Sequence, residues 1–294
     1  MMNKFRLSSN AFDRESEEEK ILPKKVFFIS IEGNVTEKQY LRGLSKYREE
    51  LGIDALVNVE VLERSSSDTN SAPSQVIELL EEYLNLRKLS EDEMIREIPR
   101  RIIDDYGEDT IKQFIKNASQ INRALRNKIN TELTQYGYFL SYRKYLSNFD
   151  SELDEFCVLI DRDSQNHSES NMRECISYCK QNGYNCFISN PCFEFWLLLH
   201  FSNVIEEYAD KIEEIRLNDK VSASHTFVSK EVSDKAHHGK KGIGFKTKYL
   251  QRIDDAIAHA KAFPSDVDDL VDNIGCNIWK LIEKMRDFDS KNTL

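Results

Sequence analysis

The stretch FCVLIDRDSQ, residues 156–165, indicates the fold of this chain. Its apolar run from Phe156 to Ile160 is typical of a strand buried in a sheet. Asp161 and Asp163 follow directly. Because alternate residues of a strand point the same way, we expect both carboxylates to face one pocket at the strand's carboxyl end, where open α/β sheets hold ligands.

Two carboxylates that lie a few ångströms apart repel each other unless a cation neutralises them, so the pair predicts a metal site. A solvated turn is the alternative, because Asp is common in turns.

A third acid follows another predicted strand, in KKVFFISIEGNVTEKQYLRGL, residues 24–44. The apolar run Val26–Ile31 is followed by Glu32 and by Gly33, which permits a tight turn, and then by a helix with Thr36 as its expected N-cap. In a parallel sheet the carboxyl ends of the strands meet at one rim. Glu32 is therefore expected beside the Asp pair, in an arrangement that suits a divalent metal with oxygen ligands.

The order of strands and helices predicts an α/β fold with a parallel sheet flanked by helices. Residues 1–23 are polar and are expected to form a mobile N-terminal arm. We assign 24–87 and 151–294 to the α/β domain, the latter with a helical C-terminal region. Residues 88–150 carry isoleucines at helical spacing and predict a helical insertion, either a cap on the core or an element that binds a partner or gates substrate.

Strands are expected at 58–64 and 185–190, besides the two already described. Helices are expected at 36–50, from Pro73 onward, at 170–182, at 204–215, at 226–234, at 245–262 and at 264–288.

Bulk composition describes a globular protein with 31% charged and 40% hydrophobic residues. No apolar run approaches the ~20 residues that span a bilayer, and residues 1–20 lack an apolar signal core. We therefore expect a cytoplasmic protein with no membrane segment. The net charge of −10 argues against broad electrostatic attraction to nucleic acid but does not exclude a nuclease, because metal ions and local basic loops serve such sites.

The six cysteines are expected to be reduced core residues. Cys175 and Cys179 lie one helical turn apart, but no second Cys/His pair stands at the spacing of a zinc site.

The apolar stretch ISNPCFEFWLLLHF, residues 188–201, must be buried. Pro191 is expected at the first helical position. Glu194 is either a helix-start acid favoured by the helix dipole or a site residue, because the preceding strand ends at the same rim. His200 is interpreted as a hydrogen-bonded core histidine, with a role in the site as the alternative. Asn190 is expected to cap the following helix, with orientation of a ligand as the alternative.

The stretch KAHHGKKGIGFKTKY, residues 235–249, is basic and contains aromatic residues. Lysines near aromatics suit contact with phosphates and bases, so this stretch predicts a nucleic-acid contact, with a solvated loop as the alternative. The lysines concerned are Lys240, Lys241, Lys246 and Lys248.

Three stretches together resemble a known family: IEGNVTEKQYL at 31–41, VLIDRDSQ at 158–165 and ISNPCFEFWLLLHF at 188–201. The acid pattern resembles the Toprim domain of topoisomerases, primases and related nucleases. Within that group, the chain is similar to the RloB/AbiLii family of bacterial anti-phage defence proteins over roughly 24–85 and 153–285. The stretch 188–201 is the most specific of the three.

The resemblance implies a metal-dependent nuclease effector of an abortive-infection system, working with an ABC/AAA-type ATPase encoded alongside. Asp161 and Asp163 would hold Mg²⁺ or Mn²⁺, and Glu32 would be a further ligand or a general acid/base. Glu194 is carried as a fourth candidate catalytic residue. The substrate would be RNA or DNA, with tRNA among the candidates. Oligomeric state is open, a homodimer included.

Two rival functions remain. The chain could be a non-catalytic Toprim-like subunit that binds the ATPase or nucleic acid. Phosphoryl transfer of the haloacid-dehalogenase type also uses Asp-x-Asp after a strand. That family, however, has Thr or Val two residues after the second Asp, where this chain has Gln165, and it places the acids on its first strand.

Overall fold

The structure, a computed structural model, describes residues 24–33, 35–62, 72–135, 152–237 and 242–290. The expected N-terminal arm, residues 1–23, lies outside the described residues.

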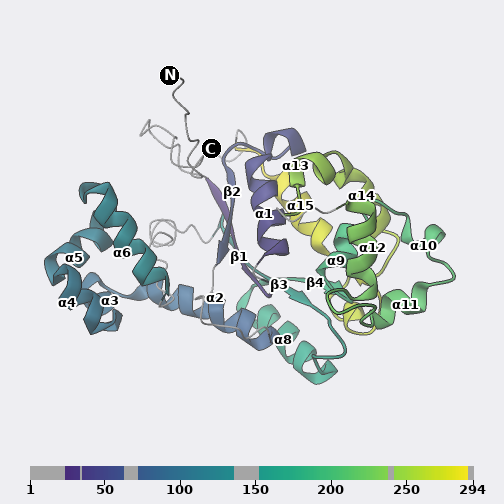
Figure 1. The fold of residues 1–294 in the computed structure, drawn as a ribbon, viewed down its shortest axis with the longest axis horizontal. Helices are drawn as coiled ribbons and strands as arrows, with labels where there is room; N and C mark the ends of the chain where they lie inside the picture. Colours follow the sequence, from purple (N-terminus) through teal and green to yellow (C-terminus); the bar gives the residue numbers. More distant parts are fainter. Residues whose placement is uncertain (1–23, 34, 63–71, 136–151, 238–241, 291–294) are drawn as a thin grey trace, which may run out of the picture.

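A sheet in the order β2-β1-β3-β4-β5 forms the centre of the molecule (Figure 1). The first four strands are parallel and β5 runs antiparallel to β4, so the predicted α/β fold is confirmed, with one antiparallel edge. The strands are β1 (Lys25–Ile31), β2 (Val57–Leu62), β3 (Glu155–Asp161), β4 (Asn185–Asn190) and β5 (Gly275–Cys276).

Helices cover both faces of the sheet, which explains why the central strands are apolar along their whole length. On β1, Phe27 and Ile29 enter one core, while Val26 and Phe28 enter the other, as the two-residue period of a strand requires. The first core is covered by α1 (Thr36–Lys46), α9 (Phe193–Leu198) and α15 (Ile278–Asp287), and the second by α2 (Pro73–Lys88) and α8 (Glu169–Asn182).

A separate group of helices follows α2 and has a hydrophobic core of its own. Ile102, Ile111, Phe114, Ile129 and Leu133 form its centre. In Figure 1 this group lies at the far end of α2, away from α10 and α11. The described part of the segment 88–150 is therefore helical, as its isoleucine spacing indicates. Its helices are α3 (Glu91–Glu97), α4 (Arg100–Tyr106), α5 (Glu108–Asn117) and α6 (Arg123–Gln135).

The C-terminal region is more broken than its sequence pattern indicates. The helix expected at 204–215 is two short helices, because the chain turns at Tyr208 to bury that ring and to bond its hydroxyl to Glu231. The helix expected at 245–262 is likewise divided by a 3-10 turn, Leu250–Arg252. The elements are α10 (Val204–Glu207), α11 (Ile212–Leu217), α12 (Phe227–Ala236), α13 (Phe245–Lys248) and α14 (Ile253–Ala260).

The expected helix at 264–288 is wrong for its first half. Residues 264–274 form a loop with one 3-10 turn, Asp269–Val271, and then β5 pairs with β4 before α15 begins. Gly275 has an extended backbone, and a Cβ on it would lie 2.4 Å from the carbonyl oxygen of Pro264. Strand pairing thus overrides the helical pattern at this position. Within the described residues, no helix is long and apolar enough to cross a bilayer.

Candidate functional site

The site begins where β1 and β3 end together. Ile31 pairs with Leu159, so Glu32, the next residue after β1, reaches the last residue of β3. Glu32 Oε2 accepts the backbone N–H of Asp161 at 3.1 Å, and His167 Nε2 lies 3.2 Å from Glu32 Oε1. The predicted meeting of Glu32 and Asp161 at one rim is therefore observed.

Asp161 is the last residue of β3 and stands beside Ser189 of β4. Its pKa is raised well above the ordinary value, first by burial and then by the charges of Glu32, Glu37 and Glu194. The backbone N–H of Phe193 opposes this shift by bonding to the carboxylate. Acids from two other chain segments, residues 32–37 and the start of α9, thus act on the Asp161 carboxylate.

Glu37 is a fourth acid of the cluster that sequence reasoning missed. It lies in the first turn of α1 with 8% of its surface exposed, and burial together with the charges of Glu194 and Glu32 raises its pKa from 4.5 to about 7. A Cβ on Gly33 would lie 2.1 Å from Glu37 Oε1, so the absence of a side chain at Gly33 makes room for this carboxylate. Val35, not Thr36, occupies the N-cap position, and it makes no side-chain cap bond.

Glu194 lies in the first turn of α9 and is half-buried. Its charge acts on both Asp161 and Glu37, so it belongs to the cluster as well as to the helix start. The placement of Pro191 was wrong: it precedes the N-cap residue Cys192 and follows a cis peptide bond. We call Glu32, Glu37, Asp161 and Glu194 the acid cluster.

Asp163 lies outside the strand, which corrects the expectation that it points the same way as Asp161. Because β3 ends at Asp161, the alternation of a strand no longer applies two residues later. Asp163 has a φ of 28°, and its carboxylate accepts a bond from Asn166 Nδ2 at 2.7 Å. Its backbone N–H donates to the carbonyl of Pro191 at 2.9 Å, which brings it beside α9. Asp163 and Glu194 both line a cavity of about 360 Å³.

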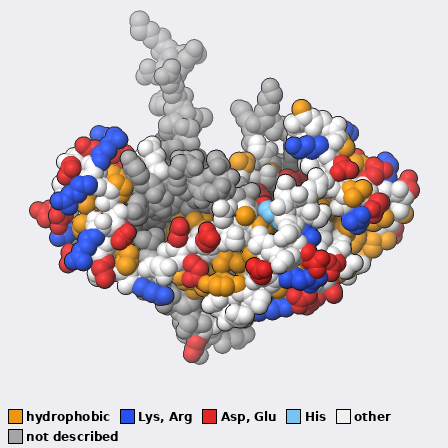
Figure 2. Space-filling model, turned by 90° about the horizontal axis from the view of Figure 1, so that it is seen from below, with side chains coloured by type: hydrophobic (Ala, Val, Ile, Leu, Met, Phe, Trp, Pro, Cys, Tyr) orange, Lys and Arg blue, Asp and Glu red, His pale blue; other side chains and the backbone are white. Residues whose placement is uncertain are grey.

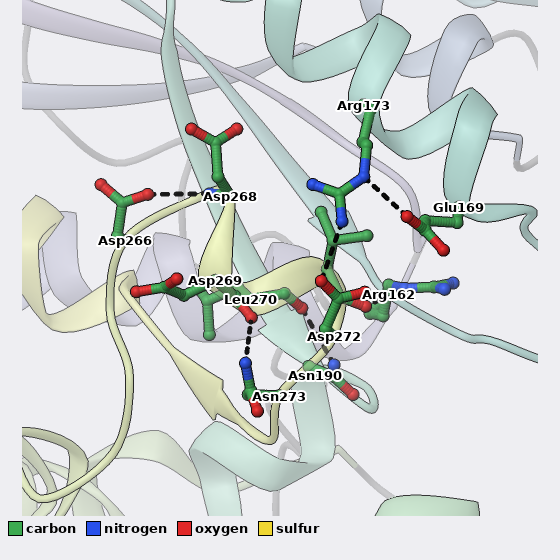
Figure 3. A network of polar contacts seen from close by, with 11 residues as sticks. Arg162, Glu169, Arg173, Asn190, Asp266, Asp268, Asp269, Leu270, Asp272 and Asn273 are labelled. Carbon is green, nitrogen blue, oxygen red and sulfur yellow. Dashed lines mark hydrogen bonds and ion pairs between the residues drawn. The ribbon is translucent and has the colours of Figure 1, made fainter.

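Arg162 lies between Asp161 and Asp163 in the chain and fixes their turn. Figure 3 shows Arg162 beside the loop that carries Leu270 and Asp272. Its guanidinium is buried and donates to the carbonyl of Val271 at 2.6 Å and to that of His167 at 2.8 Å. Asn190 donates to the carbonyl of Leu270 at 2.9 Å, so it is a brace and not the expected helix cap. The loop between α14 and β5 thus holds the ends of β3 and β4 in place.

The outer end of this network is an exposed ion pair. Arg173 on α8 bonds to Glu169 and to Asp272, each at 2.8 Å. Because Arg173 and its two acidic partners are largely exposed to solvent, these ion pairs add little stability compared with the buried hydrogen bonds of Arg162.

His167 was also missed by sequence reasoning. It is buried, and the hydrogen bond with Glu32 raises its pKa above the ordinary value. When it is protonated, the imidazole offsets part of the negative charge of the acid cluster. Its backbone N–H donates to the carbonyl of Asp163, which ties it to the same turn.

His200 lies in the core, in agreement with its interpretation as a hydrogen-bonded core histidine. Its Nδ1 donates to the carbonyl of Trp196, and the Tyr40 hydroxyl bonds to Nε2, both at 3.0 Å. Burial lowers its pKa to about 3, so the ring is neutral at physiological pH.

The two described lysines of the predicted nucleic-acid contact, Lys246 and Lys248, are engaged by other parts of the protein. Lys246 Nζ lies 5.4 Å from the ring centre of Tyr47, and Lys248 donates to the carbonyl of His237. Neither lines the cavity beside the acid cluster. Lys240 and Lys241 lie outside the described residues.

The donor set can be compared with the needs of a divalent cation. Carboxylate oxygens are the ligands that Mg²⁺ and Mn²⁺ prefer, and the charges of neighbouring acids raise the pKa of both Glu37 and Asp161, so a cation between these carboxylates would be stabilised. Among the described residues, however, no group of three His, Cys, Asp or Glu side chains is already arranged to hold a metal ion. Both Glu32 oxygens are engaged by protein groups. The donor chemistry fits, and a metal would require these side chains to turn toward it.

The six cysteines are all free, and five of them are buried, as expected for core residues. A further hollow, about 500 Å³, lies between α2 and α8 on the opposite face of the sheet from α1. Figure 2 views this face, where acidic and hydrophobic side chains gather together. Its lining includes Ile77, Glu78, Glu81, Glu82, Glu174 and Tyr178.

Comparison with known protein families matches residues 27–285 to the RloB-like protein family. The chain belongs to the RloB-like family. The match begins in β1 and ends in α15, so it includes all four residues of the acid cluster. No curated protein and no solved structure is similar enough to count as a match.

Proposed function

We propose that this RloB-like chain is a metal-dependent endonuclease that cleaves phosphodiester bonds of RNA or DNA. The observation that carries the proposal is the acid cluster: four carboxylates from three chain segments meet at the carboxyl ends of parallel strands, where α/β sheets bind ligands. Isolated buried carboxylates are costly, and a set of them is suited to a hard divalent cation.

Mg²⁺ or Mn²⁺ in such a site would polarise the scissile phosphate and supply a reactive water at neutral pH. Asp161, Glu37 and Glu194 would bind the metal, as their charges already converge on one volume. Glu32 would join them when its bond with His167 opens. His167 would then lose the hydrogen bond that raises its pKa, so metal binding would favour its neutral form.

The wider role follows from the family resemblance. We propose a Toprim-type effector of a bacterial abortive-infection system that acts with an ATPase encoded beside it, on a substrate that includes tRNA among the candidates. The net charge of −10 favours a partner with a basic surface. Co-expression with the neighbouring ATPase and recovery of both chains from one affinity tag would support the partnership, and failure to co-purify in either nucleotide state would contradict it.

The test of the nuclease is incubation with tRNA, plasmid and single-stranded DNA, each with Mg²⁺, with Mn²⁺ or with EDTA. Wild type is compared with Asp161→Asn, which removes one charge from the cluster, and with Glu206→Gln, an exposed acid of α10 as a matched control. We expect cleavage by wild type and the control in the presence of metal and none by Asp161→Asn. Equal cleavage by Asp161→Asn, or undiminished cleavage in EDTA, would overturn the proposal.

The alternative is a non-catalytic subunit that binds the ATPase or nucleic acid. The observation in its favour is that both Glu32 oxygens are bonded to protein groups, so the cluster is partly neutralised without metal. This alternative predicts intact partner binding and intact defence in Asp161→Asn.

A further inference from the structure

The cavity beside the acid cluster has two chemically different walls. The wall nearer the sheet carries Asp163 and Glu194, and the opposite wall, from residues 217–229, carries Lys220, His225, Thr226 and Ser229. Acids thus face cationic and hydroxyl groups across a space of about 360 Å³.

The opposite wall is a fixed part of the fold. Lys220 and Thr226 form a β-bridge, and the backbone N–H of Phe227 donates to the carbonyl of Asp219. Gln165, which follows the Asp161–Asp163 turn, donates to the carbonyl of Leu217 and to Asp219 Oδ1, both at 2.9 Å. These bonds tie the wall directly to the rim that carries the acids.

Two side chains on this wall, Lys220 and His225, are available to a ligand. Among the described residues, no hydrogen-bond or ion-pair partner of the Lys220 ammonium is found, and the side chain is exposed. His225 Nδ1 bonds to Ser224 Oγ at 2.9 Å, which leaves Nε2 available. The start of α12 is already satisfied by protein groups, because the Phe227 and Val228 N–H groups donate to Asp219 and Asn218 and the Thr226 hydroxyl donates to Ser229. Lys220 and His225 are therefore the groups on this wall that favour an anion.

We infer that this cavity binds one phosphorylated nucleoside, with its phosphate held by Lys220 and His225. The inference rests on the proposed function, because the phosphate then lies between the cationic wall and the acids that would bind metal. The cavity volume is at the lower end of the range for ligand pockets, about 300 to 1,000 Å³. The cavity would therefore accept a single unpaired nucleotide of a nucleic-acid strand.

The test measures binding in EDTA, so that it does not depend on cleavage. The probes are adenosine and uridine 5′-monophosphates and a 5′-phosphorylated five-nucleotide single-stranded RNA, titrated by calorimetry. Lys220→Ala and His225→Gln are compared with wild type and with Lys230→Ala. Lys230 is an exposed lysine of α12 that pairs with Asp234 and does not line the cavity. Circular dichroism establishes that each variant is folded.

We expect Lys220→Ala and His225→Gln each to weaken binding about tenfold or more, as the loss of one charged hydrogen bond does, and Lys230→Ala to bind like wild type. Tighter binding of the RNA than of the monophosphates identifies an unpaired strand as the ligand, and equal binding identifies a free nucleotide. Either result supports the phosphorylated nucleoside. Wild type that binds none of the probes, or cavity variants that bind them as well as wild type does, would overturn the inference.

The outcome is separable from that of the nuclease. Binding that depends on Lys220 and His225 without any cleavage supports the cavity and rejects the nuclease. Metal-dependent cleavage that these two substitutions leave unchanged supports the nuclease and rejects the cavity as its substrate site.

Discussion

Replacing Glu37 with Gln should stabilise the metal-free protein at alkaline pH. Glu37 is buried, and its pKa is raised from 4.5 to about 7 by burial and by the charges of Glu194 and Glu32. Between these two pH values the folded protein binds a proton at Glu37 that the unfolded chain does not. Stability therefore falls as pH rises through this window, and Gln, which resembles the protonated acid, removes the fall.

The size of the effect follows from the pKa. Each tenfold change in proton affinity corresponds to about 1.4 kcal/mol, so the rise from 4.5 to about 7 corresponds to roughly 3 kcal/mol. At pH 8 the whole of this difference opposes folding of wild type. At pH 5 Glu37 is protonated in the folded protein and mostly ionised in the unfolded chain, so its ionisation still opposes folding by about 1 kcal/mol.

The assay is urea denaturation in EDTA at pH 5, 6, 7 and 8, followed by circular dichroism. We expect Glu37→Gln to exceed wild type by about 3 kcal/mol at pH 8 and by about 1 kcal/mol at pH 5. Glu206→Gln, an exposed acid, should match wild type throughout. A difference between Glu37→Gln and wild type that does not change with pH would refute the reasoning, because it would come from packing and not from ionisation.

Three other predictions concern the same rim. The bond with Glu32 raises the pKa of His167, so this bond stabilises the fold at low pH and the contribution is lost as pH rises. In the same denaturation assay, His167→Gln should therefore lose more stability relative to wild type at pH 5.5 than at pH 8.5. Arg162→Gln leaves two buried carbonyls without their donor and should cost about 2–4 kcal/mol. Arg173→Gln breaks only exposed ion pairs and should cost clearly less in the same denaturation assay, so equal losses would contradict this. Mg²⁺ must displace the Glu37 proton, so calorimetry should give weaker Mg²⁺ binding at pH 6 than at pH 8, and pH-independent binding would exclude Glu37 as a ligand.

The sheet and three of the four cluster acids, Glu32, Asp161 and Glu194, were predictable because they depend on local patterns. Apolar runs that each end in an acid gave β1 with Glu32 and β3 with Asp161, and the parallel order of the strands placed the two together. Gly33 was recognised as a turn residue, but its role in making room for Glu37 depends on a contact that spacing does not reveal. Glu37 stands inside the stretch 31–41, and a second acid in that stretch was the available signal.

Other features of the site depend on long-range contacts. Asp163 follows the strand in the sequence, yet its turn is set by Arg162, whose bonds reach Val271 more than a hundred residues away. The same loop supplies β5, which replaced part of a predicted helix because pairing with β4 outweighs helical periodicity. His225 and Lys220 come from a segment with no strong pattern, so the second wall of the cavity became visible in the structure alone.

The acid cluster opposes folding when its acids are ionised, and a cation bound by these acids would offset that cost. Glu37 alone opposes folding by roughly 3 kcal/mol above pH 7. A ligand at a hundredfold excess over its Kd stabilises the folded state by about 2.7 kcal/mol. Mg²⁺ bound by these acids would therefore restore what their repulsion removes, and Glu37→Gln should lose most of that response. If Mg²⁺ at pH 8 raises the stability of wild type and of Glu37→Gln equally, the acids do not act together on a cation, and the non-catalytic alternative becomes the better account of this rim.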